Sequence, residues 1–473
     1  MAHTHLAPRR SRRLIAALLV GALPVTSPLL GQSTPSRAWA SALDSVVTAA
    51  LTRTQTPGVQ VAVVVDGALV YERGLGLADV ESKRPVTTST LFRVGSVTKM
   101  ITAATLGELA ETGALDLRAP IRRYVPELAE RQVGEATSHQ LLTHTAGWID
   151  NAMPYGRMGE GALGEVMREV GDTLRFTEPG RVLSYSNPGY SMAGYVAERA
   201  GGARFAALAE RLVLRPTGMA RSTFRPLEAM TTDFSQGHLG APGSAATLVR
   251  PYTENTAQWA AGFLFSTAGE LARFATAMMQ GGELDGRRVL AASTVTAMTT
   301  GYQGVPGDAT SQYGYGLMVG TRNETRQWGH GGAINGFDAL VRMWPDRRAA
   351  VIVLDNRSGN PMPEIEAFVR ERVVGLPRPT PPPVVPARTG TADERARVAG
   401  TYAQGATRVS ITAGSDTLRF SQGPATLPAL LVGEDLLRVL VPTGDPTELL
   451  LVRDATGRVT YLHQSLRALA RQP

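Results

Sequence analysis

A proline-rich run is expected to divide the chain into two folded units. Residues 375–389, GLPRPTPPPVVPART, hold six prolines in fifteen positions. Proline has a fixed φ and no backbone N–H, so this run cannot continue a helix or a central strand and is extended and semi-rigid. We predict a linker over 375–392 that joins a large unit at 41–374 to a small unit at 393–473.

The first 40 residues have the order of a secretory signal peptide. Four arginines precede the apolar run Leu14–Val25, and small and polar residues follow. The apolar run is too short, and too broken by proline, to span a bilayer. We therefore expect residues 1–40 to be removed, with cleavage after Gly31 or Ala40, which leaves an exported periplasmic or extracellular protein without a stable membrane anchor. The SRRLI stretch at Ser11–Ile15 also resembles a twin-arginine export signal, and ordinary Sec export explains it equally well.

Charge and cysteine content exclude several classes of protein. The formal charge of +7 falls to +2 without the five arginines of residues 1–40, so the basic balance gives no sign of a nucleic-acid partner. The chain has no cysteine, which excludes disulfides, thiol nucleophiles and a lipid-modified cysteine. Its seven histidines show no carboxylate partners at metal-ligand spacing, and we expect neither a metal nor a cofactor.

Two pairs of β-rich runs flank a helical middle. Residues 58–76 give two runs around the turn signal Asp66-Gly67, and residues 331–356 give a second hairpin pattern. Helical spacing is clear at 97–112, which Gly113 follows, and at 268–282, which ends in two glycines. The pattern predicts an α+β fold, in which both hairpins join one antiparallel sheet that is flanked by helices and carries a helical insertion.

Short β-like runs follow the linker at regular spacing. They are RVSIT (408–412), TLRF (417–420), LLRVLV (436–441), ELLLVR (448–453) and VTYLH (459–463), separated by Gly, Asp and Pro turns. Spacing of this kind predicts a small antiparallel barrel or sandwich, and we expect a barrel.

Lysine is almost absent from the chain, and one lysine lies close to a serine. Of the 48 basic residues only Lys83 and Lys99 are lysine, and Lys99 comes three residues after Ser96, at the start of a predicted helix. Residues three apart on a helix share a face, so the two side chains can touch. A serine hydroxyl needs a base to become a nucleophile; a neutral lysine can act as one, whereas arginine stays protonated. The S-x-x-K spacing also arises by chance, so it needs support from elsewhere in the chain.

Two further motifs give that support. Tyr185–Asn187 reads Y-x-N, and His330–Gly332 reads H-x-G ahead of an apolar strand. Taken singly, each has an ordinary structural explanation as a core tyrosine, a turn or a structural histidine. With Ser96 and Lys99, the set resembles the serine β-lactamase and penicillin-binding-protein superfamily over roughly residues 42–372. The likeness is to the branch of class C β-lactamases, D-alanyl-D-alanine carboxypeptidases and β-lactamase-like esterases.

The resemblance implies a role for each matched residue. Ser96 is the nucleophile that forms an acyl-enzyme. Lys99 and Tyr185 transfer protons together, and the sequence leaves the division between them open. Asn187 donates to the acyl side chain of the substrate and orients it.

The H-x-G motif at His330–Gly332 is expected to line the side of the site opposite Ser96. The backbone N–H groups of Ser96 and Ala333, next to Gly332, form the expected oxyanion hole, which is worth several kcal/mol in a transition state. His330 stands where many relatives have lysine, and it is expected to give a polar or positive wall beside Tyr185.

One position departs from the pattern of the superfamily. The third motif often reads K-T-G or H-T-G, with a hydroxyl that holds a substrate carboxylate, but Gly331 has no side chain. We expect weak recognition of β-lactam carboxylates unless Arg342 or Arg357 replaces the hydroxyl. His144 and Trp148 are expected to pack or to shape their loop.

The resemblance implies a secreted serine hydrolase that acts on a small-molecule or peptide substrate: an ester, a D-amino-acid peptide or a β-lactam. The alternative is a penicillin-binding or cell-wall-sensing module that is acylated and scarcely turns over. The small C-terminal unit is similar in pattern to lipocalin-like domains that accompany D-amino-acid-directed peptidases of this superfamily. Such a unit is expected to assemble a homo-oligomer or to cover the mouth of the site.

The role of Lys99 is open to a direct test. Lys99→Arg keeps the positive charge but removes the neutral amine, so we expect turnover to fall by about 10²–10⁴-fold, the usual contribution of a general base. Steady-state kinetics on a chromogenic ester measure the loss. Near-native activity in this variant would exclude Lys99 as the base.

Overall fold

The computed structural model describes residues 38–150, 157–240, 244–358, 361–380, 385–442 and 446–473. Trp39–Pro473 forms one compact unit, separate from Met1–Ala38. The predicted signal peptide therefore lies almost wholly outside the described residues, as does part of the predicted linker.

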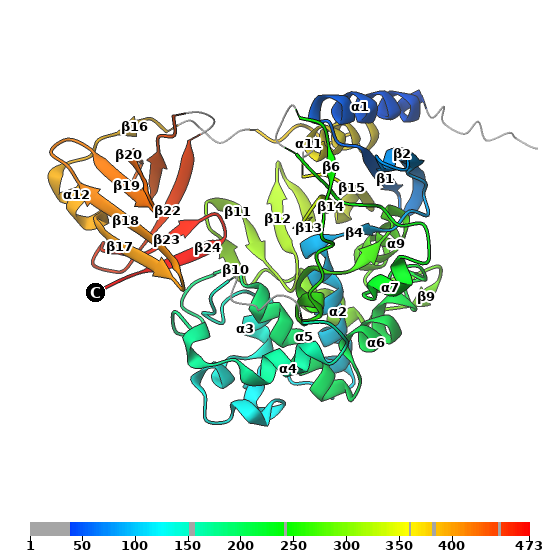
Figure 1. The fold of residues 1–473 in the computed structure, drawn as a ribbon, viewed down its shortest axis with the longest axis horizontal. Coiled ribbons are helices and arrows are strands. Elements are labelled where there is room, and N and C mark those ends of the chain that lie inside the picture. The colour runs from blue at the N-terminus through cyan, green and yellow to red at the C-terminus, as the bar shows by residue number, and fades with distance from the viewer. Residues whose placement is uncertain (1–37, 151–156, 241–243, 359–360, 381–384, 443–445) are drawn as a thin grey trace, which may run out of the picture. The chain divides into compact units, whose positions relative to one another are not determined.

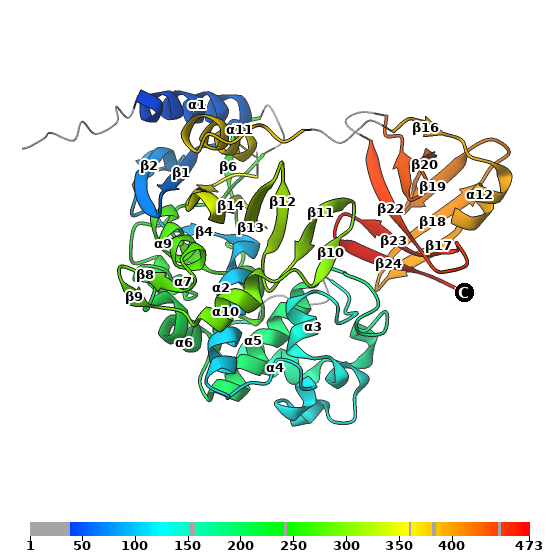
Figure 2. The ribbon, with the colours of Figure 1, turned by 180° about the vertical axis from the view of Figure 1, so that it is seen from behind.

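A nine-stranded antiparallel sheet forms the centre of the large part of the chain (Figures 1 and 2). Its order is β10-β11-β12-β13-β14-β15-β1-β2-β3. The strands are β1 Gly58–Val65, β2 Ala68–Asp79, β3 Arg84–Pro85, β10 Gln303–Val305, β11 Asp308–Tyr313, β12 Met318–Arg322, β13 Thr325–Ile334, β14 Phe337–Trp344 and β15 Ala349–Asp355. Both predicted hairpins are confirmed, and they share this sheet through the pairing of β1 with β15.

The middle of the sheet is buried on both faces. Val59, Val61 and Val63 of β1 face one apolar cluster, while Ala62 and Val64 face another. The alternation follows from the two-residue period of a strand, and a strand covered on both sides reads as one continuous apolar run. The sequence of β1, GVQVAVVV, has this form.

Helices cover both faces of the sheet. The described helices are α1 Ala38–Thr54, α2 Thr98–Glu111, α3 Ser138–Leu142, α4 Ala162–Glu169, α5 Asn187–Gly201, α6 Phe205–Ala209, α7 Pro226–Ala229, α8 Trp259–Gly262, α9 Ala268–Met279, α10 Ala292–Thr299, α11 Met362–Phe368 and α12 Ala392–Val398. Helices α1 and α11 share one apolar cluster with β1 and β15, and α9 belongs to the cluster on the opposite face. Figure 1 shows α1 and α11 lying together along one side of the sheet. The α+β class expected from the sequence is thus confirmed.

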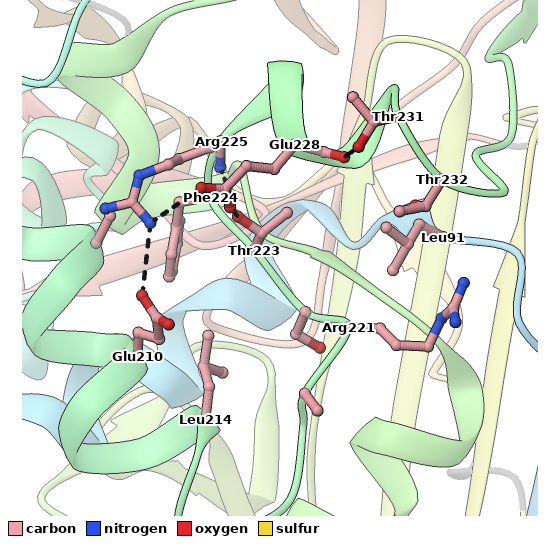
Figure 3. Close-up of a pocket in the computed structure, with 13 residues that line it drawn as sticks. Leu91, Glu210, Leu214, Arg221, Thr223, Phe224, Arg225, Glu228, Thr231 and Thr232 are labelled. Carbon is pink, nitrogen blue, oxygen red and sulfur yellow. Dashed lines mark hydrogen bonds and ion pairs between the residues drawn. The ribbon is translucent and has the colours of Figure 1, made fainter.

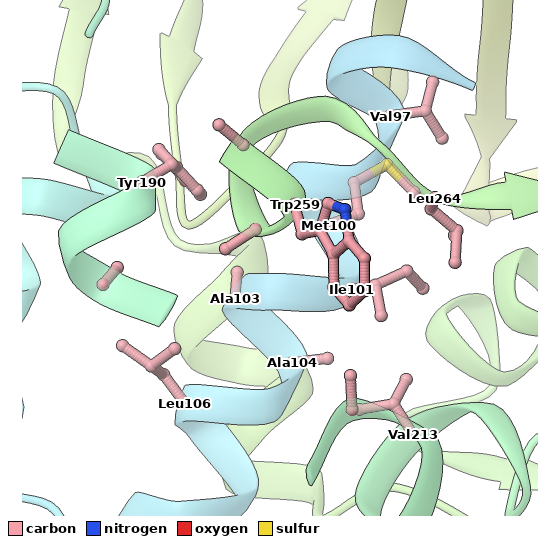
Figure 4. Packing of buried hydrophobic residues seen from close by; sticks show 14 of the residues in the cluster. Val97, Met100, Ile101, Ala103, Ala104, Leu106, Tyr190, Val213, Trp259 and Leu264 are labelled. Atoms are coloured by element: carbon pink, nitrogen blue, oxygen red, sulfur yellow. The ribbon is translucent and has the colours of Figure 1, made fainter. Parts of the chain in front are cut away.

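Helix α2 runs through the middle of the helical insertion. Its residues Met100, Ile101, Ala103, Ala104 and Leu106 are almost completely buried. Figure 4 shows them surrounded by side chains from several other segments of the insertion. A helix buried on every side is held rigidly by its neighbours, because protein interiors are close-packed. The predicted helix at 97–112 is therefore confirmed, with a short 3₁₀ turn at Gly95–Val97 ahead of it.

The second predicted helix is also present, with its glycine stop. It is α9, and Gly281 and Gly282 after it have φ of +66° and +95°. These left-handed angles suit glycine, which has no Cβ to clash with the backbone. Three short two-stranded sheets pair β4 Phe92–Arg93 with β7 Phe265–Ser266, β5 His238–Leu239 with β6 Thr247–Leu248, and β8 Glu283–Leu284 with β9 Arg287–Arg288.

The C-terminal strands close into a barrel. Eight strands follow one another around the ring, and β20 pairs with β21 to close it, while β16 Ala387–Arg388 pairs with β20 from outside the ring. The ring strands are β17 Gly400–Gln404, β18 Thr407–Ala413, β19 Leu418–Gln422, β20 Ala425–Val432, β21 Leu436–Val439, β22 Thr447–Arg453, β23 Val459–Gln464 and β24 Arg467–Arg471. The five predicted strands are confirmed, and β17, β20 and β24 complete the barrel. Their inward side chains form a separate apolar core.

The first described helix is anchored to the sheet. The ring of Trp39 lies 6.0 Å from that of Tyr71 on β2, and the Tyr71 hydroxyl donates to Asp44 Oδ1 at 2.6 Å. Helix α1 thus begins before the expected boundary at Ala40 and packs through residues on both sides of it. Among the described residues, no helix is long and apolar enough to cross a membrane.

Candidate active site

The 3₁₀ turn before α2 presents Ser96 next to Lys99. Lys99 is completely buried, and its Nζ lies 3.2 Å from Ser96 Oγ. Gly95 has a φ of +50°, and a Cβ at this position would lie 2.6 Å from the nitrogen of Ala333. Glycine is therefore required here, because the turn that carries the serine passes directly against β13.

Lys99 makes two shorter contacts besides the one to Ser96. Its Nζ lies 2.7 Å from Asn187 Oδ1 and 2.6 Å from the carbonyl oxygen of Ala261. Both partners can only accept, so they take the two hydrogens of a neutral amine. The remaining lone pair of the amine is then directed to the Ser96 hydroxyl.

Burial makes the neutral form of this lysine accessible. Removal from water lowers the pKa of Lys99 to about 7; the charge of Asp150 opposes this shift and the charge of Arg467 reinforces it. An amine with a pKa near 7 is partly unprotonated at neutral pH, as a general base must be. The geometry and the pKa both suit Lys99 as the base for Ser96.

Tyr185 and Asn187 come from the start of α5. Ser186 caps this helix by accepting the Gly189 N–H at 3.1 Å, and Pro188 lies in the first turn. The sequence Ser-Asn-Pro thus fixes a helix start that projects the neighbouring side chains into the site. The ring centroid of Tyr185 lies 4.7 Å from Lys99 Nζ.

The Tyr185 phenol remains protonated in this setting. Burial raises its pKa above the usual value, and the hydrogen bond with Ser96 opposes that shift only in part. A protonated phenol beside the serine is a proton donor rather than a base. The pKa shifts of the two groups favour Lys99 as base and Tyr185 as donor, and this assignment stays a prediction.

The strand β13 closes the site opposite α2. A Cβ on Gly332 would lie 2.1 Å from the Val94 carbonyl oxygen and 3.0 Å from the Ser96 nitrogen. Only glycine allows this approach, which brings the backbone of β13 directly against the turn that holds the Ser96 nitrogen. Ser96, Asn187 and Ala333 also line one cavity of about 180 Å³. The geometry suits the expected oxyanion hole, whose assignment to these two N–H groups stays a prediction.

His330 is neutral and belongs to a buried chain of hydrogen bonds. Burial lowers its pKa to about 4, so of the two expectations the polar wall is favoured over the positive one. Its Nδ1 donates to the Gly331 carbonyl, and its Nε2 accepts from the Tyr313 hydroxyl at 2.9 Å. His144 continues the chain: its Nδ1 accepts the Ser186 N–H at 3.1 Å, and its Nε2 lies 3.2 Å from Tyr313 Oη.

Of the hydrogen-bonded side chains of His330, Tyr313 and His144, the two histidine rings pack against Tyr185. The His144 ring centroid lies 4.2 Å from that of Tyr185. Trp148 of the same loop is buried as well. The expectation that His144 and Trp148 pack and shape a loop agrees with this arrangement, and His144 additionally ties the start of α5 to β11 and β13.

A side chain at position 331 would have free space around it. Neither Arg342 nor Arg357 replaces the hydroxyl that Gly331 lacks. The nearest atom to a Cβ on Gly331 would be the Ala339 carbonyl oxygen at 3.9 Å. Arg342 pairs with Glu366 at 3.3 Å, and buried Arg357 donates to the Gln55 carbonyl oxygen at 2.7 Å. Both arginines are engaged elsewhere in the fold, so the suggestion that one of them replaces the hydroxyl is not supported.

A larger cavity of the described part of the protein contains no residue of the three motifs. A cavity of about 300 Å³ is lined mainly by the segment 220–232 and by Leu91, Glu210 and Leu214 (Figure 3). Its Arg225 pairs with Glu210 at 3.5 Å and with Glu160 at 2.6 Å. In the part of the chain that the structure describes, no group of three or more His, Cys, Asp or Glu side chains is placed to hold a metal ion.

Two residues of the site were not found from the sequence. Asp150 accepts the backbone N–H of Asn187 at 2.9 Å, and Arg467 of the barrel lies over the Tyr185 ring at 5.3 Å and bonds to Asp150. Asp150 directly follows the THTAGWI stretch, so a carboxylate next to a loop of the family pattern was the available signal. Nothing local marks Arg467, which lies 282 positions after Tyr185.

Comparison with known proteins identifies the family. The family model described as Beta-lactamase matches residues 43–376, which is most of the chain. The chain belongs to the beta-lactamase family. This confirms the resemblance and the fold inferred from the three motifs, and it makes the chain a member of a family of serine hydrolases.

Relatives within this beta-lactamase family carry several activities in their names. Esterase EstB of Burkholderia gladioli is 36% identical over 197 residues, 38% of this chain and 50% of EstB. D-aminopeptidase of Gluconobacter oxydans is 31% identical over 337 residues, 68% of this chain and 60% of that protein. The matched regions thus cover about half to three-fifths of the length of these relatives.

A solved structure resembles nearly the whole described fold. The crystal structure of SurE superposes with a TM-score of 0.77 at 27% identity and covers 92% of this chain and 100% of its own. The matched 92% of this chain is longer than the large unit at 41–374, so the similarity includes the C-terminal barrel.

The two neighbouring glycines of the third motif should respond differently to substitution. Gly331→Thr has room and restores a hydroxyl, so we expect acylation by benzylpenicillin to rise about 2- to 10-fold, the value of one hydrogen bond. Gly332→Ala would drive β13 away from Ser96 and should reduce activity on every substrate.

The measurement is the second-order acylation rate with benzylpenicillin beside ester turnover. Gly331→Ala is the matched control and should resemble the wild type in both. An unchanged penicillin rate in Gly331→Thr, or full activity in Gly332→Ala, would contradict this account of the strand.

Proposed function

We propose that this protein is an exported serine acyl hydrolase that cleaves esters or D-amino-acid amides through an acyl-enzyme on Ser96. The observation that carries the proposal is the buried amine of Lys99, 3.2 Å from Ser96 Oγ with a pKa lowered to about 7. A nucleophile with a neutral base in reach is the requirement for covalent acyl transfer.

In the acylation step, Ser96 Oγ attacks the substrate carbonyl carbon as Lys99 Nζ takes its proton. The negative charge that develops on the carbonyl oxygen is met by the N–H groups of Ser96 and Ala333. Collapse of the tetrahedral intermediate breaks the bond to the leaving group. Tyr185 hands its phenolic proton to the departing oxygen or nitrogen and recovers a proton from the Lys99 ammonium.

Deacylation reverses the proton movements. A water molecule attacks the ester formed on Ser96, and Lys99 accepts the proton of that water. The acid leaves as Ser96 Oγ regains its proton. Asn187, whose Oδ1 is occupied by Lys99, has its amide N–H groups left to orient the acyl side chain.

The substrate preference rests on the wall at Gly331. That position offers no hydroxyl, and Arg342 and Arg357 are bonded elsewhere, so a β-lactam carboxylate would lack a dedicated partner. The names of an esterase and a D-aminopeptidase among the relatives support the same preference.

A side-by-side assay tests the proposal. We expect hydrolysis of p-nitrophenyl butyrate or D-alanine p-nitroanilide to exceed hydrolysis of nitrocefin, and Ser96→Ala to lose about 10³-fold or more of all activity. Intact mass after incubation with penicillin gives the second readout. Turnover that survives in Ser96→Ala would overturn the proposal, and a persistent penicillin adduct without ester turnover would favour the acylated sensor instead.

Export is part of the proposal, and the anchoring of α1 suggests where the leader is cut. Cleavage after Ala40 would remove Trp39, which packs on Tyr71, whereas cleavage after Gly31 keeps this contact. N-terminal sequencing of protein made with its own leader and recovered outside the cytoplasm should therefore begin at Gln32. An uncleaved cytoplasmic product would exclude export, and a mature start at Ser41 would exclude the preferred site.

A further inference from the structure

The barrel contributes backbone and side chains to the surroundings of Tyr185. The carbonyl oxygen of Leu466, in the turn between β23 and β24, accepts the Tyr185 N–H at 2.8 Å. The neighbouring hydroxyl of Ser184 accepts the Ala468 N–H at 3.1 Å and the Gln404 amide at 2.8 Å. The segment that carries the Y-x-N motif is therefore hydrogen-bonded to the last hairpin of the chain.

Asp150 joins this hairpin to the start of α5. Its side chain is 2% exposed, and its Oδ1 accepts the backbone N–H of Asn187 at 2.9 Å. Its Oδ2 accepts from Arg467 at 2.6 Å and 2.7 Å. A buried carboxylate is costly unless it is paired and hydrogen-bonded, and here each oxygen has a partner.

Arg467 faces the same ring as Lys99. The guanidinium of Arg467 lies 5.3 Å from the centroid of Tyr185, and Lys99 Nζ lies 4.7 Å from it. The Arg467 distance is within the range of cation–π attraction, whereas the neutral Lys99 amine is only packed against the ring. Tyr185 is thus the shared neighbour of one basic group from the large unit and one from the barrel.

We propose that Asp150 and Arg467 are positioning residues that complete the catalytic centre: they hold Tyr185 and Asn187 in place and set opposite charges beside Lys99. The inference deepens the proposed hydrolase function and rests on it. The barrel is then a component of the active site and not only a neighbour of it.

The surroundings of Lys99 make these two charges decisive. Its direct contacts are neutral: the Ser96 hydroxyl, the Asn187 amide, the Ala261 carbonyl and the rings of Tyr185 and Tyr190. Burial lowers the pKa of both His144 and His330, so these rings are neutral as well. Among the described residues, the charges that act on the pKa of Lys99 are the carboxylate of Asp150, which raises it, and the guanidinium of Arg467, which lowers it.

The two single variants should therefore shift the pH profile in opposite directions. The neutral amine is the active form, so kcat/KM falls as the pH drops through the pKa of Lys99. Arg467→Gln removes a repelling cation and should move this acid limb to higher pH. Asp150→Asn removes an attracting anion and should move it to lower pH. We expect each displacement to be about 0.5 pH unit or more.

A merely structural ion pair would behave differently. Both variants break the same bond, so loss of packing alone would lower activity in each and leave the limb in place. Arg467→Lys retains the charge and should keep the limb close to its wild-type position. Arg438→Gln, which breaks a barrel ion pair with Glu448, is the matched control and should leave the profile unchanged.

The experiment uses the full-length mature protein and p-nitrophenyl butyrate from pH 5 to 9, with thermal melts to show that each variant is folded. The rate at which a fluorophosphonate labels Ser96, followed by intact mass over the same pH range, gives a second readout that needs no turnover. The inference is overturned if the acid limbs of Arg467→Gln and Asp150→Asn move in the same direction, or if neither limb moves. A wild-type protein without Ser96-dependent labelling or turnover would instead overturn the proposed hydrolase function.

Discussion

The burial of one amine is the constraint around which the site is built. Lys99 is completely buried on a helix that is itself enclosed, and it is held by oxygen atoms from three separate segments. A charged ammonium would be costly in such a place, so the fold favours the neutral form that a general base requires. The tight approach of β13, the cap of α5 and the turn at Gly95 all serve to fix groups around this nitrogen.

The same constraint explains why lysine survives at this position in a chain that otherwise uses arginine. A guanidinium stays protonated even when buried, and its planar fork would need more hydrogen-bond acceptors than this pocket offers. Lys99 is one of two lysines among 48 basic residues, and the proposed role as a base is one that arginine could not fill. The scarcity of lysine is therefore informative because an amine can lose its proton where a guanidinium cannot, and rarity alone would not indicate a role.

Local patterns predicted much of the fold and the contacts of the matched residues. The hairpins at β1–β2 and β14–β15, helices α2 and α9 and five barrel strands were readable because each carries its own periodicity and turn residues. The barrel strands β17, β20 and β24 were missed because the alternation of apolar and polar residues in them is weak, although each forms a hairpin with a strand next to it in sequence. Asp150 and Arg467 were missed for a different reason: only the folded chain brings residues 150 and 467 together, and no short motif records a contact of that kind.

The pairing of β1 with β15 has a consequence for how the chain reaches its folded state. Strand β1, an inner strand of the large sheet, is made early, but one of its two hydrogen-bonding neighbours, β15, begins at Ala349, almost 300 residues later. The sheet cannot close until nearly three quarters of the polypeptide has been synthesised, and closing so long a loop makes folding slow. Strand β1 is therefore left without its β15 partner while residues 66–348 are being made.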